Sequence, residues 1–181
     1  MCGIAGILPN QPTDTGELTH WVRRMTDRIV HRGPDDEGFH VTPRVALGMR
    51  RLAIIDVAHG QQPMFGRDGR RALVFNGEIY NYRTLRAELE LAGWPFKTDS
   101  DTEVEAGGPE LWGQDGLKRL EGMFGLATWD DNTGKLLLAR DWLGRKSIYF
   151  TRCDLGFAFA SEINPLLELP GVQKVLNLQA M

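Results

Sequence analysis

The second residue of this 181-residue sequence is a cysteine, and it is the sharpest chemical feature of the chain. Removal of the initiator Met1 before a small residue would leave Cys2 with both a thiol and a free α-amine. The neutral amine could accept the thiol proton, directly or through water, so that one residue would supply nucleophile and base. Taken alone, a cysteine at this position is more often a small buried residue that opens a strand.

Asn76-Gly77-Glu78 directly follows an expected strand at 72–75. The Asn76 side-chain amide and the Gly77 backbone N–H could together receive the oxyanion of a tetrahedral intermediate, because glycine allows close approach to a ligand. The simpler alternative is a type I′ hairpin turn, which an Asn-Gly pair alone would favour.

Two charged positions could hold the ends of an amino acid. Arg51 opens a further expected strand, where a guanidinium suits bidentate recognition of a carboxylate, although alone it could be a surface charge. Asp101 lies in Ser100-Asp101-Thr102-Glu103, which could equally begin a helix capped by Ser100 or Asp101. His31 and Arg32 could serve as a catalytic histidine or a second anion clamp, but no histidine is required where an amine is the base.

The elements that would position these residues are read from periodicity and turn signals. A capping-box spacing of Asp14 and Glu17 precedes a helical apolar face over 17–31, and a second helix is expected at 82–92 before Gly93. The segment 31–38 predicts a turn-rich loop. Strands are expected at 3–8, 45–49, 52–57, 72–75, 123–129, 135–140, 147–151 and 157–160. Because helices and strands come in separate blocks and strands pair in hairpins, the pattern predicts an α+β layered fold.

Composition excludes several classes of protein. Apolar residues make up 42%, charged residues 25%, and the formal net charge is -3, so there is no basic field for nucleic acid. The sequence contains no run of about 18 apolar residues, which a membrane span would require, and no recognisable signal peptide. Cys2 and Cys153 are too few for a disulfide scaffold and fit no metal-ligand spacing. We therefore expect a soluble, cytoplasmic protein without a metal, a membrane or a nucleic-acid partner.

The ordered motifs together resemble the N-terminal glutaminase domain, a class II glutamine amidotransferase, of glutamine-dependent asparagine synthetases. The motifs are Met1-Cys2-Gly3-Ile4-Ala5-Gly6, His31-Arg32-Gly33-Pro34-Asp35, Arg51-Leu52-Ala53-Ile54-Ile55-Asp56, Gln62-Pro63-Met64, Asn76-Gly77-Glu78-Ile79-Tyr80-Asn81, Ser100-Asp101-Thr102-Glu103, Gly122-Met123-Phe124 and Ala139-Arg140-Asp141-Trp142-Leu143-Gly144. The resemblance covers essentially the whole chain, through Ala160-Ser161-Glu162-Ile163. It is closer to the asparagine synthetase branch than to the glucosamine-phosphate synthase or amidophosphoribosyltransferase branches.

The resemblance implies the four-layer αββα sandwich of the N-terminal-nucleophile hydrolases and L-glutamine as substrate. It assigns Cys2 as nucleophile and Asn76 and Gly77 as the oxyanion hole. It also implies that Arg51 holds the substrate α-carboxylate and that Glu78 and Asp101 meet its α-ammonium group. Leu52, Ile54 and Ile55 would contribute groups beside the substrate, and the loop of His31 and Arg32 would be scaffolding.

Two segments depart from the pattern of the resembled family. Gly107-Gly108-Pro109 should break or restart the helix that follows Asp101, because glycine and proline are poor helix formers. Arg145-Lys146-Ser147 replaces apolar and proline character and should unsettle a local turn.

We expect an amidotransferase domain at 1–165, followed at 166–181 by a tail or the start of a linker. The sequence contains no Ser-Gly-Gly-x-Asp-Ser phosphate loop, so ATP and Mg are expected only in a partner ATP-pyrophosphatase-type synthetase domain, in cis or in trans. Three hypotheses follow for the chain: a glutaminase that supplies ammonia, a non-catalytic module that binds an amino acid or a partner, and a hydrolase of another amide. Arg51 with Asp101 argues for a free amino acid and against the third.

Overall fold

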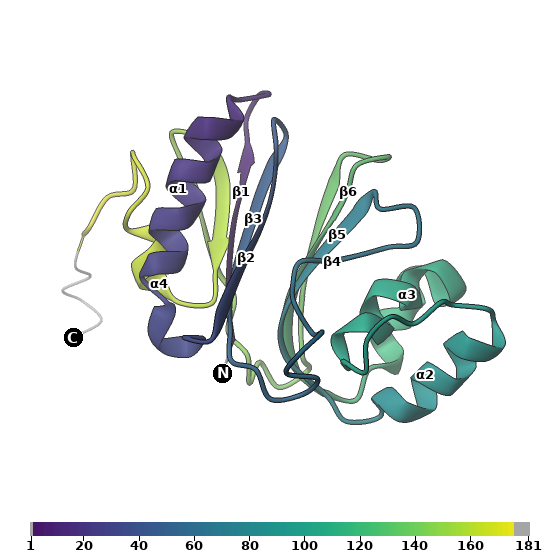
Figure 1. The fold of residues 1–181 in the computed structure, drawn as a ribbon. Coiled ribbons are helices and arrows are strands. Elements are labelled where there is room, and N and C mark those ends of the chain that lie inside the picture. Colours follow the sequence, from purple (N-terminus) through teal and green to yellow (C-terminus); the bar gives the residue numbers. More distant parts are fainter. Residues whose placement is uncertain (1, 176–181) are drawn as a thin grey trace.

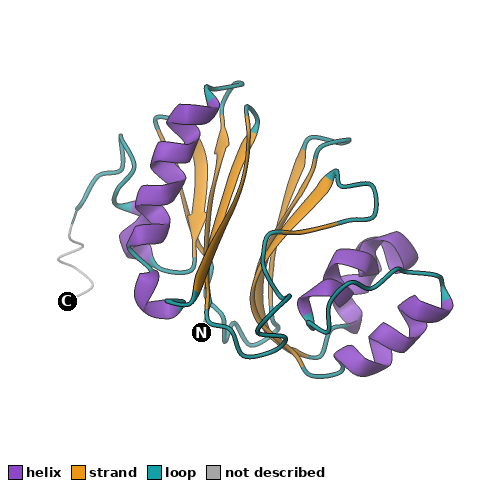
Figure 2. Ribbon diagram, viewed as in Figure 1, coloured by secondary structure: helices purple, strands orange, loops and turns teal. Residues whose placement is uncertain are grey.

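The computed structural model describes residues 2–175 and contains two antiparallel β-sheets stacked face to face, with helices on both outer faces (Figure 1, Figure 2). The first sheet has the order β2-β3-β1-β9-β8 and the second has the order β4-β5-β6-β7. The strands are β1 (Gly3–Pro9), β2 (Asp36–Thr42), β3 (Val45–Arg51), β4 (Met64–Phe65), β5 (Arg71–Ile79), β6 (Gly122–Asp130), β7 (Lys135–Arg140), β8 (Tyr149–Cys153) and β9 (Gly156–Ala160).

The helices lie outside the sheets, as the four-layer αββα prediction requires. They are α1 (Thr15–Asp27), α2 (Tyr82–Leu91), α3 (Thr102–Trp112) and the short α4 (Ile163–Leu166), with 3₁₀ turns η1 (Val30–Arg32) and η2 (Gly113–Arg119). α1 and α4 pack on the first sheet, while α2 and α3 cover the second (Figure 1). The α+β prediction is thereby confirmed. None of the helices within residues 2–175 is long and apolar enough to cross a membrane.

Side-chain alternation along β1 explains the layering. Ile4 faces the second sheet and packs in the core between the two sheets, whereas Ala5 and Ile7 face α1. Successive side chains of a strand point to opposite faces of the sheet, so a strand buried on both faces carries apolar residues on both. β1 is paired on one side with β3 and on the other with β9, so the residue that precedes it is anchored at the centre of a sheet.

The start of α1 matches its predicted cap, because the Asp14 carboxylate accepts a hydrogen bond of 3.0 Å from the Glu17 N–H. The helix ends at Asp27, before the predicted His31, and η1 replaces its last turn. α2 ends at Leu91 and Gly93 adopts a φ of 80°, as expected for a glycine stop.

Three sequence predictions about the backbone were wrong. Residues 52–57 form no strand, and the predicted loop at 31–38 gives way at Asp36 to β2, which the sequence pattern did not reveal. α3 runs from Thr102 to Trp112 without a break at Pro109. Gly107 and Gly108 leave room there for the rings of Trp94 and Trp112, and this packing offsets the weak helix propensity.

The predicted boundary between residues 165 and 166 falls inside α4. Leu166 and Leu169 are buried with the core beneath α1. Residues 176–181 of the predicted tail lie outside the described residues, and the boundary stays a prediction.

Candidate active site

The ends of β1, β3 and β5 meet at a cavity of about 90 Å³ between the two sheets. Every residue to which the resemblance assigns a part in catalysis or substrate binding lines it: Cys2, Arg51, Leu52, Ile54, Ile55, Asn76, Gly77, Glu78 and Asp101. These residues come from four separate stretches of the chain. The fold therefore assembles the predicted set in one place.

Cys2 lies directly before β1 and its sulfur contacts the start of the 52–60 loop (residues 52–60). The Leu52 N–H points at Sγ over 3.4 Å, and the thiol donates to the Leu52 carbonyl over 3.7 Å. The Arg32 guanidinium donates to the Cys2 carbonyl over 2.9 Å and pairs with Glu162, which also contacts the exposed His31. Arg32 thus holds the backbone of Cys2, in agreement with the scaffolding role implied for this loop.

Asn76 and Gly77 lie within β5, so the alternative of a hairpin turn at this pair was wrong. Gly77 is opposite Phe124 of β6, and a Cβ atom at Gly77 would collide with the Met123 carbonyl oxygen. Asn76 is 1% exposed. Neither polar atom of its amide has a hydrogen-bond partner among the described residues. A buried amide without a protein partner beside a nucleophile is suited to receive a ligand oxygen.

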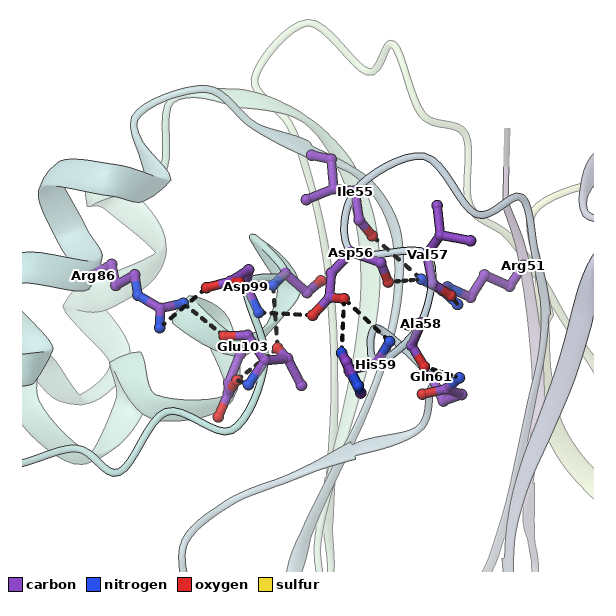
Figure 3. Close-up of polar contacts among 12 residues, drawn as sticks. Arg51, Ile55, Asp56, Val57, Ala58, His59, Gln61, Arg86, Asp99 and Glu103 are labelled. Atoms are coloured by element: carbon purple, nitrogen blue, oxygen red, sulfur yellow. Dashed lines mark hydrogen bonds and ion pairs between the residues drawn. The ribbon is translucent and has the colours of Figure 1, made fainter.

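Arg51 is 4% exposed and organises the 52–60 loop from within. Its guanidinium donates to the carbonyls of Ile55 at 3.3 Å, Asp56 at 2.6 Å and Val57 at 3.1 Å (Figure 3). These bonds use three of the five N–H donors of a guanidinium. They also explain why residues 52–57 curl into a loop instead of continuing β3.

Asp101 precedes α3 and its carboxylate reaches across to β5. It accepts a hydrogen bond of 2.8 Å from the Ile79 N–H, and burial together with the nearby Glu78 raises its pKa despite that bond. Glu78 is exposed at the mouth of the cavity. The two carboxylates and the Arg51 guanidinium line the same cavity, a combination of charges that recognition of an amino acid would need.

Lys146 lines the same cavity and was missed by the sequence analysis. It is 4% exposed. Burial is the main cause that lowers its pKa, and repulsion from Arg32 is the second. The Asp141 carboxylate fixes its loop by accepting hydrogen bonds from the N–H groups of Phe124, Leu143, Arg145 and Lys146. The turn at 145–147 is thus well anchored, contrary to expectation. The only signal in the sequence was the position of Asp141 directly after a strand.

Gln62 is a second cavity residue to which the sequence analysis gave no role. Its side-chain oxygen accepts from the Phe75 N–H over 2.7 Å, and its amide donates to the Thr102 hydroxyl over 3.5 Å. Gln62 therefore links β5 to the start of α3. Within residues 2–175, no group of three or more His, Cys, Asp or Glu side chains could hold a metal ion.

Comparison with known proteins identifies the family of this chain. A family profile described as glutamine amidotransferase domain matches residues 1–181. Asparagine synthetase [glutamine-hydrolyzing] 1 of Bacillus subtilis is 41% identical over 168 residues, which are 92% of this chain and 27% of that protein. Asparagine synthetase [glutamine-hydrolyzing] 2 of the same organism is 40% identical over 98% of this chain and 24% of its own length. The chain therefore spans about a quarter of these relatives.

Solved structures share the fold at lower identity. The glutamine phosphoribosylpyrophosphate amidotransferase of B. subtilis superposes with a TM-score of 0.76 at 20% identity, covering 91% of this chain and 43% of that chain. A structure described as the allosteric regulatory enzyme of purine biosynthesis gives a TM-score of 0.78 at 22% identity, covering 92% and 43%. With a family profile that matches its full length, the chain belongs to the glutamine amidotransferase domain family.

Proposed function

We propose that this chain hydrolyses L-glutamine to glutamate and ammonia through a thioester on Cys2, once Met1 has been removed. The observation that carries the proposal is the convergence of Cys2, Arg51, Asn76 and Asp101 on one cavity. A thiol, a buried amide, a cation and a carboxylate are the groups that an amino-acid amidase needs. Membership of the amidotransferase family supports the same reaction.

In the proposed reaction the α-amine of Cys2 takes the thiol proton, and the thiolate attacks the side-chain amide carbon of glutamine. The Asn76 amide and the Gly77 N–H receive the oxyanion. The C–N bond then breaks, ammonia leaves with the proton returned by the amine, and a γ-glutamyl thioester remains. Water attacks the thioester with the amine again as base, which releases glutamate and restores the thiol.

Arg51 and Asp101 would select a free amino acid by pairing with its α-carboxylate and α-ammonium groups, with Glu78 beside the ammonium. Leu52, Ile54 and Ile55 line the same wall of the cavity. A peptide glutamine offers neither charge, so this pairing argues against a hydrolase of other amides.

We further propose that the ammonia serves asparagine synthesis. This step is supported by the names of the two B. subtilis relatives, of which the chain spans only about a quarter. An ATP-pyrophosphatase-type synthetase domain, in cis or in trans, would bind ATP and Mg and consume the ammonia, and the glutaminase itself would need no cofactor. A cytoplasmic location fits the chain's two cysteines and stays a prediction.

The second candidate is a non-catalytic module that binds an amino acid or a partner. It is favoured if Met1 stays attached, because the nitrogen of Cys2 would then be an amide and no base. The two candidates share the binding groups and differ only in the state of the first residue.

The purified protein tests the proposal directly. Intact mass should be lower than that of the full sequence by one methionine, and the protein should release ammonia from glutamine. A glutamine-mimicking electrophile should label Cys2, and excess glutamine should protect it. Cys153→Ala, which changes the other cysteine, should retain both labelling and activity. A processed protein that binds glutamine but neither turns it over nor forms the adduct would refute the catalytic proposal.

Asp101 makes glutamine binding sensitive to acid. Its raised pKa means that it takes up a proton at a higher pH than an exposed aspartate, for which the pKa is ~3.9. The neutral acid cannot pair with an ammonium group. On acidification, KM for glutamine should therefore begin to rise at a higher pH than it would if the group were an exposed aspartate. Asp101→Asn should raise KM about tenfold at neutral pH and flatten this dependence, since each tenfold is ~1.4 kcal/mol.

Steady-state ammonia release across pH measures this effect. Asp115→Asn is the matched control, because Asp115 is 78% exposed and lies outside the cavity. An Asp101→Asn protein with the KM and pH profile of the wild type would show that Asp101 does not meet the substrate.

A further inference from the structure

Besides Arg51, the 52–60 loop is held in place by Asp56, a residue to which the proposed reaction gives no role. Asp56 has a φ of 46° and is the one non-glycine residue in the described part of the chain with a positive φ. This left-handed conformation is uncommon for an L-residue, although aspartate tolerates it better than most. The residue therefore adopts it because surrounding contacts hold it there.

The Asp56 carboxylate bridges two segments of the chain. One oxygen accepts from the His59 N–H over 3.1 Å and lies 3.2 Å from the His59 ring nitrogen Nδ1. The other accepts from the Asp99 N–H over 2.8 Å (Figure 3). The Asp56 side chain is only 9% exposed. The bond from Asp99 is the largest cause that lowers the pKa of Asp56, so the bridge persists in its charged form.

The two bridged segments carry opposite ends of the proposed amino-acid site. On one side, Arg51 binds the carbonyl of Asp56 itself over 2.6 Å. On the other side, Asp101 lies two residues beyond Asp99. Gly60 closes the loop through its N–H to the Asp56 carbonyl over 2.9 Å, and a Cβ atom there would crowd the Arg51 guanidinium. Asp56 is thus the link between the cationic and the acidic walls of the cavity.

We propose that Asp56 is a positioning residue that sets the separation of Arg51 from Asp101 and thereby the affinity for glutamine. The inference rests on the proposed function, in which those two residues bind the substrate. The α-carboxylate and α-ammonium groups of an amino acid are attached to one carbon, so their partners must be held at a fixed separation. Asp56 does not line the cavity and acts only through the two walls.

Asp56→Asn is the decisive variant, because it keeps the shape of the side chain but removes its charge and turns one acceptor into a donor. KM for glutamine should rise about tenfold with kcat changed less than twofold, since binding is lost equally in the ground and transition states. The Kd for glutamine in a Cys2→Ala background should rise by the same factor. Asp68→Asn is the matched control, because Asp68 also accepts a backbone N–H, at 2.9 Å from Arg70, but lies outside the cavity.

Hydrogen exchange without ligand gives an independent measurement. In Asp56→Asn, amides of residues 52–60 and 97–100 should exchange faster, while those of β1 and β6 remain protected. If the Cys2→Ala protein binds glutamine and Asp56→Asn leaves its Kd unchanged, the inference is overturned and the proposed function stands. If the Cys2→Ala protein binds no glutamine, the proposed function fails. Unchanged hydrogen exchange in residues 52–60 and 97–100 of Asp56→Asn would overturn the bridge itself. A loss of kcat with unchanged KM would also overturn the inference.

Discussion

Replacing Asn76 by alanine should lower kcat for glutamine hydrolysis about 10²–10³-fold, the loss typical of removing one oxyanion-hole donor. Asn76 is 1% exposed and lines the same cavity as Cys2, and its side-chain amide has no hydrogen-bond partner among the described residues. Burial restricts the rotamers of this donor before the oxyanion forms. Its loss therefore falls on the transition state more than on substrate binding, and KM should change little. Steady-state ammonia release measures both constants.

The fold should survive this change, which separates a catalytic role from a structural one. Truncation of the Asn76 amide breaks no hydrogen bond within the described protein. Asn76→Leu, of similar size but without the amide, should lose kcat to the same extent and have a Tm equal to or higher than that of the wild type, because a buried polar group without a protein partner is costly. Variants that melt early, or that keep wild-type kcat, would contradict the assignment of Asn76 to the oxyanion hole.

The membership of the site was predictable from the sequence, whereas its internal contacts were not. The motifs that contain Cys2, Arg51, Asn76 and Asp101 each place a polar residue on or next to a helix or strand, and the fold brings these residues to one cavity. Nothing in the sequence indicated that Arg51 donates to the carbonyls of residues 55–57, or that Lys146 is buried in the same cavity. Such contacts depend on how β3 and the loop after β7 lie relative to β1.

The 52–60 loop shows why local pattern misled the strand prediction. Residues 52–57 are apolar enough to predict a strand, yet Ile54 is 73% exposed and Val57 is 64% exposed. The loop forms because Arg51 gathers its carbonyls and because Asp56 binds the N–H of Asp99, which lies 43 positions further along the chain. A contact at that separation leaves no trace in a window of six residues.

Tertiary packing overrides helix propensity in α3 as well. Pro109 removes one backbone N–H from the helix, and two glycines precede it. A Cβ atom at Gly107 would approach the Trp94 ring to 2.8 Å, so the glycine is what allows the indole to lie against the helix. The sequence contained both the glycine and the tryptophan, but their contact became visible only in the fold.

Glu105 on the same helix should make the protein less stable as the pH rises. It is 4% exposed, and burial raises its pKa from 4.5 to about 8, with only Arg71 opposing the shift. Between these two values the folded state binds a proton that the unfolded state has released. The free energy of unfolding should therefore fall by roughly 1.4 kcal/mol per pH unit from about pH 5 to pH 8 through this group, and level off above. The total loss is on the order of 3–5 kcal/mol.

Glu105→Gln should remove this slope, so that the variant is more stable than the wild type at pH 8 and nearly equal to it at pH 5. Urea unfolding at each pH measures the difference. Glu103→Gln is the matched control on the same helix, because the Glu103 carboxylate accepts hydrogen bonds from the Lys97 N–H at 2.9 Å and from the Thr98 N–H at 2.8 Å. Its replacement should destabilise the fold without removing the slope. Parallel pH profiles for wild type and Glu105→Gln would mean that Glu105 ionises in the folded protein as readily as in the unfolded chain.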